Sequence, residues 1–346
     1  MRKLITLLLL IISITQTTYA MDFSAPDPPD SAQEYLPQQS SSFTEDLWFI
    51  IRKAIGSFMP SLSEAAGTCV SVLAICLLVS TLNGLNSLSA RSVELVGTLC
   101  VATALSLPSN SLISVGIRTI ESISEYGKLL IPVITASLAA EGGSVSSATL
   151  YTGTILFNTV ITVGISKLLI PMLYAFIAIS VAKSVINESM LSSIHKFIKW
   201  LMTWTLKISI YIFTGYLGVT SVITGKVDAA AVKAAKIAIS GTVPVIGNII
   251  SDASETILVS ASLMKNAVGT YGLLAIIALW IGPFLQIGAQ YLTLKITGAV
   301  SDVFGSKQTV SLIHEFSSAM GFLVAMTGTL CLLFFVSIVC FMKGAG

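Results

Sequence analysis

The sequence predicts an all-α fold, a polytopic transmembrane helix bundle of about six to seven spans with amphipathic or re-entrant segments. Only 10% of its 346 residues are charged and 54% are hydrophobic, whereas soluble domains carry about 25% charged residues. The mean hydropathy is +0.88. A chain of this length and composition cannot cover itself with a water-facing surface. It also lacks the alternating segments of about ten residues that are typical of a membrane β-barrel.

The first twenty residues have the pattern of a cleaved signal peptide. Arg2 and Lys3 form a positive start, Leu4–Ile14 is apolar, and Thr18–Ala20 provides a small-x-small cleavage pattern. The apolar run is shorter than the ~20 residues that a spanning helix needs, so we expect cleavage rather than an uncleaved first helix. Removal of Arg2 and Lys3 would leave a formally neutral chain, which gives no argument for nucleic-acid binding.

Two short regions are expected between the signal peptide and the membrane domain. Residues 21–42 are rich in Pro, Ser and Asp and lack the apolar content to fold, which predicts a disordered extracytoplasmic leader. Residues 43–60 follow Ser42 and Glu45, which have capping-box spacing, and carry apolar residues at helical intervals. They predict an amphipathic helix on the membrane surface or on the bundle, with a docking face for a partner helix as the alternative.

The polytopic membrane domain is expected over residues 66–343. Seven apolar runs have roughly the length that a bilayer requires; they are Ala66–Leu88, Val93–Val115, Val145–Ser166, Leu168–Ile186, Leu201–Thr224, Ala267–Tyr291 and Met320–Met342. Three intermediate segments mix amphipathic character with Gly or Pro and could lie on the interface or re-enter the membrane; they are Arg118–Ala140, Gly225–Met264 and Leu292–Ala319.

Seven crossings after an external leader would place Lys343 inside the cell, as the positive-inside bias prefers. The same count leaves Lys196 and Lys199 outside, against that bias.

Cysteine and histidine usage gives no support for a metal or cofactor site. The five cysteines lie in apolar runs without a CxxC motif, where they behave as small buried hydrophobic residues. His195 and His314 are far apart and have no ligand spacing near them. No P-loop, zinc-protease motif or locatable Ser/His/Asp arrangement is present. We therefore predict no cofactor, no metal and no enzyme activity.

The candidate functional segment is Ser240–Gly272, which is too apolar for an ordinary loop and too interrupted for a plain spanning helix. Helix breakers and acids stand together within it; they are Gly241, Pro244, Gly247, Asp252 and Glu255. The two acids, three residues apart, would share one helix face. They have the spacing of a capping-box variant, although an acid within a membrane element also suggests a functional role, facing a lumen or a partner.

A short sequence that occurs twice raises the alternative of a transporter built from repeats. Lys128–Pro132 and Lys167–Pro171 have the same five residues, KLLIP, and paired Pro-interrupted segments can mark the broken helices of such a transporter. A five-residue identity in a chain this rich in Leu and Ile arises readily by chance, and the flanking residues do not extend it.

Two segments resemble a known family. The stretch from Ser240 through Gly272, with its apolar continuation to Trp280, and the segment Leu129–Phe157 are similar to the stage III sporulation protein AE family of endospore-forming bacteria. The resemblance extends from about Ala66 to the end of the chain through the number and order of apolar segments. It brings no catalytic motif with it.

The resemblance implies a multi-span membrane component of a secretion-like channel complex that links mother cell and forespore and is required for late forespore development. It implies a location in the mother-cell membrane around the forespore. The implied partners are the other stage III proteins of the same operon and the forespore protein stage II Q, beside the lipid bilayer, with a homo-oligomer as an open alternative. A stand-alone small-solute permease and a structural scaffold without a lumen remain alternative functions.

Overall fold

The computed structural model describes residues 25–37, 42–84, 90–140, 146–186, 189–223 and 267–343, and these residues form helices and short connections without a β-strand. The predicted signal peptide lies outside this described part of the chain. The same holds for residues 224–266, and therefore for Gly241, Pro244, Gly247, Asp252 and Glu255. The all-α prediction is confirmed.

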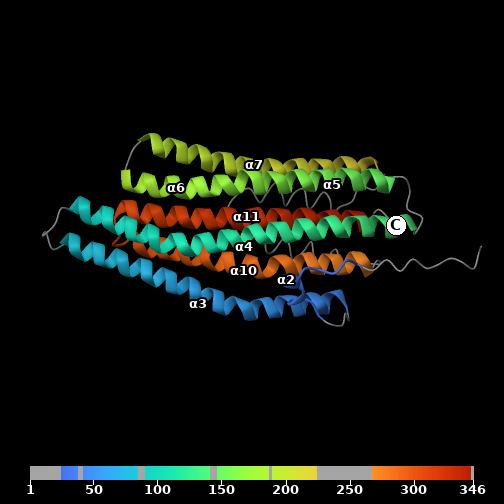
Figure 1. The fold of residues 1–346 in the computed structure, drawn as a ribbon, viewed down its shortest axis with the longest axis horizontal. Coiled ribbons are helices and arrows are strands. Elements are labelled where there is room, and N and C mark those ends of the chain that lie inside the picture. The colour runs from blue at the N-terminus through green and yellow to red at the C-terminus, as the bar shows by residue number, and fades with distance from the viewer. Residues whose placement is uncertain are drawn as a thin grey trace, which may run out of the picture.

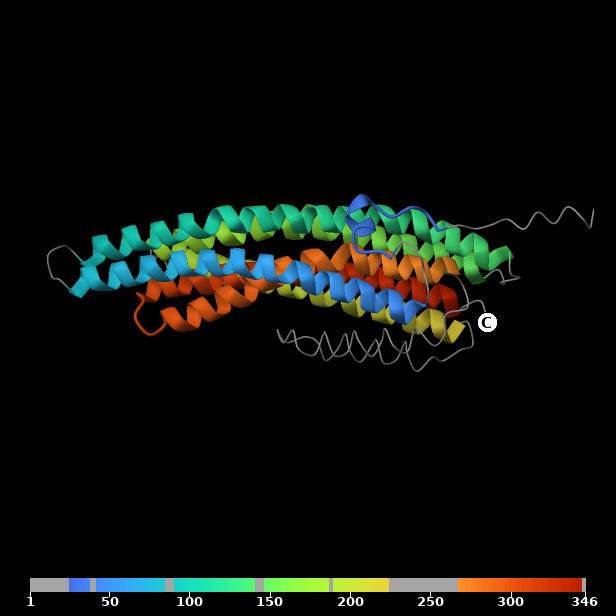
Figure 2. The ribbon, with the colours of Figure 1, turned by 90° about the horizontal axis from the view of Figure 1, so that it is seen from below.

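Long helices lie side by side and make an elongated bundle (Figures 1 and 2). They are α3 (Phe43–Gly84), α4 (Ala90–Ala140), the continuous run of α5 (Ser146–Gly164), η1 (Ile165–Leu169) and α6 (Ile170–Ile186), then α7 (Ser189–Ile223), α10 (Ala267–Ser301) and α11 (Lys307–Lys343). The 51 residues of α4 correspond to a length of about 76 Å. Five of these passes are long and apolar enough to cross a membrane; they begin at Phe43, Arg91, Gly153, Val268 and Lys307.

The described chain passes along the bundle six times, with successive passes antiparallel (Figure 1). The α3–α4, α6–α7 and α10–α11 connections lie together at what we call the connection end. The leader end holds the start of α3, the α4–α5 connection, the end of α7 and the end of α11. The six described passes place Lys343 at the end where α3 begins. Residues 224–266 lie outside the described part of the chain, and the number of membrane crossings stays a prediction.

Two predicted spans form one continuous helical run. Val145–Ser166 and Leu168–Ile186 join through the π-helical turn η1, in which the Ile170 N–H donates to the Ile165 carbonyl. Pro171 explains the turn, because it has no N–H for the carbonyl one α-helical turn earlier. A π-bulge absorbs the mismatch without ending the helix.

Other prolines also lie inside helices rather than at helix ends. Pro60 lies inside α3, Pro108 and Pro132 lie inside α4, and Pro283 lies inside α10. The amphipathic helix expected at 43–60 is therefore the first half of α3, and Arg118–Ala140 continues α4 instead of re-entering the membrane. Proline removes one backbone hydrogen bond, and neighbouring helices in a bundle can offset that loss.

Part of the leader expected over residues 21–42 lies within the described residues. Residues 25–37 include the short helix α2 (Asp30–Gln33), which packs on α10. Ala32 is fully buried, and the Tyr35 hydroxyl lies 3.4 Å from Ser57 Oγ on α3. A few well-placed apolar contacts with α3 and α10 thus order a segment whose composition alone indicates disorder.

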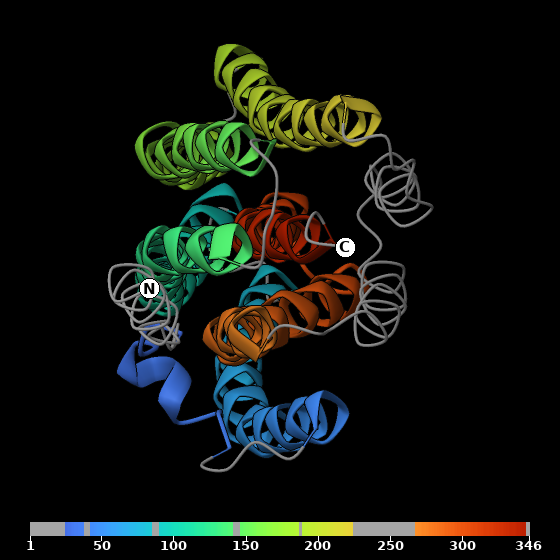
Figure 3. The same ribbon diagram turned by 90° about the vertical axis from the view of Figure 1, so that its right-hand side faces the viewer.

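The core of the bundle is built around α11. In the end-on view, α11 lies centrally, with α3 and α7 at opposite edges (Figure 3), and α11 packs on α10, α4, α6, α5 and α7. Phe316, Leu323, Leu330 and Phe334 of α11 are almost completely buried. Much of the apolar content of α10 and α11 therefore serves the protein interior rather than lipid.

Candidate functional site

A charged cluster joins α6, α7 and α11 around one carboxylate, Glu315. Its Oε1 lies 3.7 Å from Lys183 Nζ, and its Oε2 lies 3.4 Å from His195 Nε2 and 3.3 Å from Lys199 Nζ. Lys199 Nζ also lies 3.3 Å from Ser318 Oγ. One acid on the central helix thus contacts basic groups from both helices of the α6–α7 hairpin.

Helix periodicity and the short α6–α7 connection create this cluster. His195 and Lys199 are four residues apart on α7 and therefore share one face. Lys183 lies three residues before the end of α6, so the hairpin returns α7 beside it. The α11 helix then supplies Glu315 to the same side, and Ser318, three residues further, follows on the same face of α11.

The solvent exposure of the side chains varies across the cluster, from buried to exposed. The His195 side chain is 2% exposed and that of Glu315 is 15% exposed, whereas Lys183 and Lys199 are 26% and 43% exposed. The carboxylate is therefore largely withdrawn from water, which is costly for a charge unless it is paired and hydrogen-bonded. The two ammonium groups provide the charge while keeping partial contact with solvent or headgroups, as long lysine side chains commonly do.

The hydrogen bonds around His195 define its tautomer. Nε2 lies 3.0 Å from Ser180 Oγ, and Ser180 donates its own hydroxyl proton to the Phe176 carbonyl at 2.7 Å. Both the serine oxygen and the Glu315 carboxylate can then only accept, so His195 Nε2 carries the proton. The ring also stacks on Phe176 with centroids 4.5 Å apart. His195 is held in one orientation as a donor toward Glu315.

A second buried polar group lies nearer the leader end, between α4, α5 and α11. Asn158 is 3% exposed and its Nδ2 lies 3.4 Å from Ser337 Oγ. Its Oδ1 has no hydrogen-bond partner among the described residues. This amide lines a small cavity together with Ser124, Lys128 and Thr159. The accessible wall of this cavity is almost entirely apolar, with Ile131, Ile155 and Phe334 also lining it, so the amide oxygen is a buried acceptor in an apolar setting.

These arrangements can fix helices and hold charge, but they offer no geometry for bond making. No group of three or more His, Cys, Asp or Glu residues that could hold a metal occurs within the described ranges. The Glu315 cluster is instead a polar tie between a peripheral hairpin and the central helix.

Sequence reasoning missed the Glu315 cluster. It found no metal-ligand spacing near His195, and it considered Lys199 only for its side of the membrane. The i,i+4 spacing of His195 and Lys199 was the only local signal, because Glu315 is more than a hundred residues away. The predicted residues Gly241, Pro244, Gly247, Asp252 and Glu255 lie outside the described part of the chain. The structure therefore does not place them near this cluster or elsewhere.

Comparison with known proteins gives the family. The model of the family described as stage III sporulation protein AE matches residues 32–345, nearly the whole chain. The chain belongs to the stage III sporulation protein AE family. It is similar to the stage III sporulation protein AE of Bacillus subtilis (strain 168), with 21% identity over 221 residues that cover 64% of this chain and 55% of that relative. The match thus spans little more than half the length of the relative.

No solved structure matches this chain. The family assignment thus rests on sequence, and it includes both α11 with Glu315 and the α6–α7 hairpin within the matched range. Within this matched range, the Glu315 contacts and the Asn158–Ser337 hydrogen bond join different helices.

Proposed function

We propose that this chain is a multi-span membrane component of a sporulation-specific, secretion-like channel complex between mother cell and forespore. The observation that carries this proposal is the family match over residues 32–345, combined with five helices long and apolar enough to cross a membrane. The role is non-catalytic. The protein contributes a membrane platform or part of a conduit, and late forespore development depends on it.

The proposed setting is the mother-cell membrane that surrounds the forespore. The proposed partners are other proteins of the stage III sporulation operon and the forespore protein stage II Q. A bundle of six antiparallel passes supports this setting, because it presents connections at both ends that partners on either side of a membrane can reach.

The packing of the bundle argues that a conduit would form between chains. Along the centre, α11 is largely buried, with 72% of its most apolar stretch inside the protein. Side chains such as Phe316, Met320 and Leu323 fill the space that a central lumen would need. We therefore favour a subunit that lines a passage together with partners or further copies. The scaffold alternative is favoured by the same dense core.

A stand-alone small-solute permease is less well supported. Such transporters bind substrate near the middle of the membrane, at broken helices. The Glu315 cluster instead joins uninterrupted α-helical stretches of α6, α7 and α11, without a broken helix beside it. Reconstitution of the purified protein in liposomes separates the two: solute uptake by the protein alone would favour a permease.

The segment Ser240–Gly272 remains a proposed assembly or conduit element. Asp252→Asn should preserve a helix N-cap, since Asn caps about as well as Asp, whereas Asp252→Ala should cost about 0.5–2 kcal/mol of local helix stability. If charge matters, Asp252→Asn and Glu255→Gln should lower spore yield while the protein stays at normal abundance in the membrane. Wild-type spore yield from both variants would leave helix capping as a sufficient account.

The experiment that tests the proposed function is deletion of this chain in the spore-forming bacterium that carries it. We expect sporulation to arrest after engulfment, with late forespore gene expression lost and restored by the wild-type chain. Microscopy and a late forespore reporter measure both effects. Normal spores from the deletion strain would contradict the assignment.

A further inference from the structure

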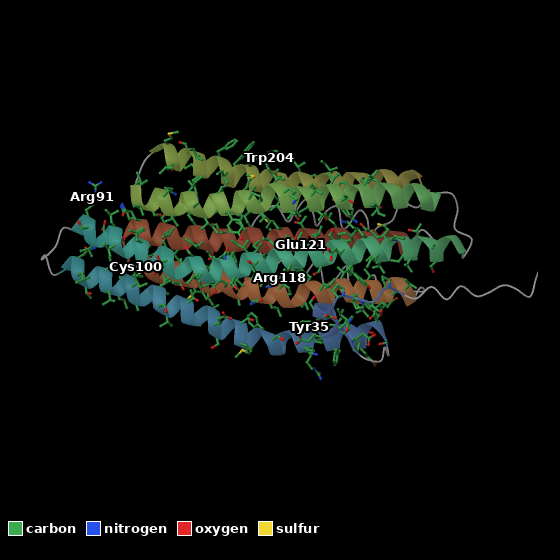
Figure 4. All side chains as sticks on the ribbon, in the orientation of Figure 1. Tyr35, Arg91, Cys100, Arg118, Glu121 and Trp204 are labelled. Atoms are coloured by element: carbon green, nitrogen blue, oxygen red, sulfur yellow. The ribbon has the colours of Figure 1, made fainter. Side chains whose placement is uncertain are left out.

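The α3–α4 hairpin carries most of its charges on the half next to the leader end. On the half next to the connection end, the large exposed side chains are apolar and stand among small hydroxyl residues; they are Val70, Leu77, Leu78, Leu82, Val96, Leu99 and Leu107. Cys100 is exposed on the same face of α4. On the leader-end half of α3, exposed charges such as Arg52 and Lys53 alternate with exposed apolar side chains; these are Trp48, Phe49, Ile55 and Met59. On the half next to the leader end, the exposed side chains of α4 include Arg118, Glu121, Glu125 and Lys128. Figure 4 shows Arg91, Cys100, Arg118 and Glu121 following one another along α4.

Both helices have a long stretch without charges, and the stretch on α4 extends further from the connection end. On α3, the last charged residue before the connection end is the exposed Glu64, and residues 65–84 contain no Asp, Glu, Lys or Arg. On α4, residues 95–117 contain none either. Glu64 on α3 and Asn110 on α4 lie the same number of residues from the connection, so the first charge on α4, Arg118, lies eight residues beyond the height of Glu64.

The length of the charge-free half fits a bilayer. The 20 residues from Ala65 to Gly84 rise about 30 Å along a helix, which is the thickness of a bilayer hydrocarbon core, about 30 Å. The full helices are roughly twice as long as that core, since α3 has 42 residues and α4 has 51. The hairpin cannot be immersed over its whole length without placing Arg118, Glu121 and Glu125 in hydrocarbon, which is strongly unfavourable for charges.

Exposed hydroxyl groups on the charge-free half also suit lipid. Ser71 donates to the Gly67 carbonyl at 3.0 Å, Thr81 to the Leu78 carbonyl at 2.9 Å and Thr103 to the Leu99 carbonyl at 2.9 Å. Each hydroxyl is thereby satisfied within its own helix. Polar groups that face hydrocarbon need such internal partners, because no water is available there.

We propose that the α3–α4 hairpin crosses the bilayer only with residues 65–84 and 90–109, whose outer face contacts lipid acyl chains. The leader-end half, residues 43–64 and 118–140, projects from the membrane into water as a helical extension. Residues 90–109 include two charged residues, Arg91 and Glu94, both within the first five residues of α4. They lie at the opposite headgroup layer, where long charged side chains can reach water. The leader contact between Tyr35 and Ser57 then belongs to the projecting extension.

Two lysines of the α6–α7 hairpin lie near the height of the proposed membrane boundary. Lys167 is exposed 19 residues before the end of α6, and Lys207 is 18 residues after the start of α7, so both lie near the proposed boundary height. On α5, exposed Leu156, Val160 and Val163 continue beyond Lys167. We therefore assign the boundary to the α3–α4 edge alone.

Cysteine accessibility in the reconstituted full chain tests the proposal. In the first variant, the other four cysteines are replaced by alanine, so that the native Cys100 reports on the lipid-facing half; they are Cys69, Cys76, Cys331 and Cys340. In the second variant, Cys100→Ala is added to these replacements, and Glu121→Cys reports on the extension. A water-soluble maleimide should modify Glu121→Cys about tenfold faster or more than Cys100, because a thiol in lipid neither ionises nor meets the reagent. Leu107→Cys should behave as Cys100 does, and Glu125→Cys as Glu121→Cys does.

A second measurement needs no substitution, in case the alanine background fails to fold. The unmodified protein in lipid nanodiscs is footprinted with a lipid-soluble diazirine and, separately, with hydroxyl radicals. The diazirine should label residues 65–84 and 90–109, and the radicals should label residues 118–137. Equal maleimide rates at Cys100 and Glu121→Cys, or diazirine labelling that continues through Glu121 and Glu125, would overturn the proposal.

Discussion

Glu315 shows how one residue can secure a peripheral helix pair in this bundle. Its carboxylate contacts three basic side chains, Lys183, His195 and Lys199, at distances of 3.3–3.7 Å. The contacts with the lysines are partly exposed, and pairs of that kind are individually weak. The contact with His195 is buried and fully oriented by Ser180 and Phe176. The cluster therefore acts mainly by specifying where the α6–α7 hairpin sits on α11.

Glu315→Gln tests this role. The amide keeps the size of the side chain but leaves Lys183 and Lys199 without an anionic partner, and we expect a loss of about 1–3 kcal/mol of unfolding free energy. Unfolding of the purified protein by SDS titration in mixed micelles measures it. Glu121→Gln, on the exposed face of α4, is the matched control and should change stability by no more than about 0.5 kcal/mol. Equal effects of the two substitutions would contradict the proposed role of Glu315.

At the residue scale, sequence patterns could identify which residues are unusual but not their partners. The lysines on α6 and α7 were visible as charges in apolar runs, and the two histidines were visible as isolated. His314 lies 3.5 Å from Asp302, twelve residues before it. The partner of Lys183, His195 and Lys199 is instead an acid more than a hundred residues away, on a helix whose neighbours depend on the whole topology. Local periodicity carries no information about such a pairing.

At the scale of elements, close approach between α4 and α11 depends on glycine. A side-chain carbon built on Gly127 would overlap the ring of Phe334, and one on Gly116 would lie 2.5 Å from Leu323 Cδ1. Small residues allow helices in a membrane bundle to pack closely. Helix type was well predicted because apolar character and periodicity are local properties. Helix extent was predicted less well, because the surrounding bundle accommodates Pro60, Pro108 and Pro171 inside longer helices.

Gly127→Ala and Gly67→Ala form a pair that separates packing from helix propensity. Gly127→Ala should destabilise the protein by about 1–3 kcal/mol through overpacking against Phe334. Gly67 has no heavy atom within 4 Å of the added carbon, so Gly67→Ala should stabilise α3 by about 0.5–1 kcal/mol. The same SDS titration measures both. A stabilising Gly127→Ala would show that α4 and α11 are not in close contact there.

At the scale of the whole molecule, the described residues of this sporulation family member form a bundle of six antiparallel passes. Composition and hydropathy were sufficient to predict a polytopic helical membrane protein, because they report how much of the chain can face water. They were not sufficient to give the parity of the passes. That depended on η1, where a proline-linked π turn joins two apolar runs that look like separate spans.

The sidedness of the connections tests this account most directly. Single cysteines are placed at Ser87, Asn187 and Val303 for the connection end, and at Gly142 and Gly344 for the leader end, in sealed vesicles from cells that carry the full chain. A membrane-impermeant maleimide added from one side should label the first three sites as a group. The last two should be labelled only from the other side. Labelling of Gly142 and Gly344 from opposite sides, or of Ser87 and Asn187 from opposite sides, would contradict the six-pass bundle.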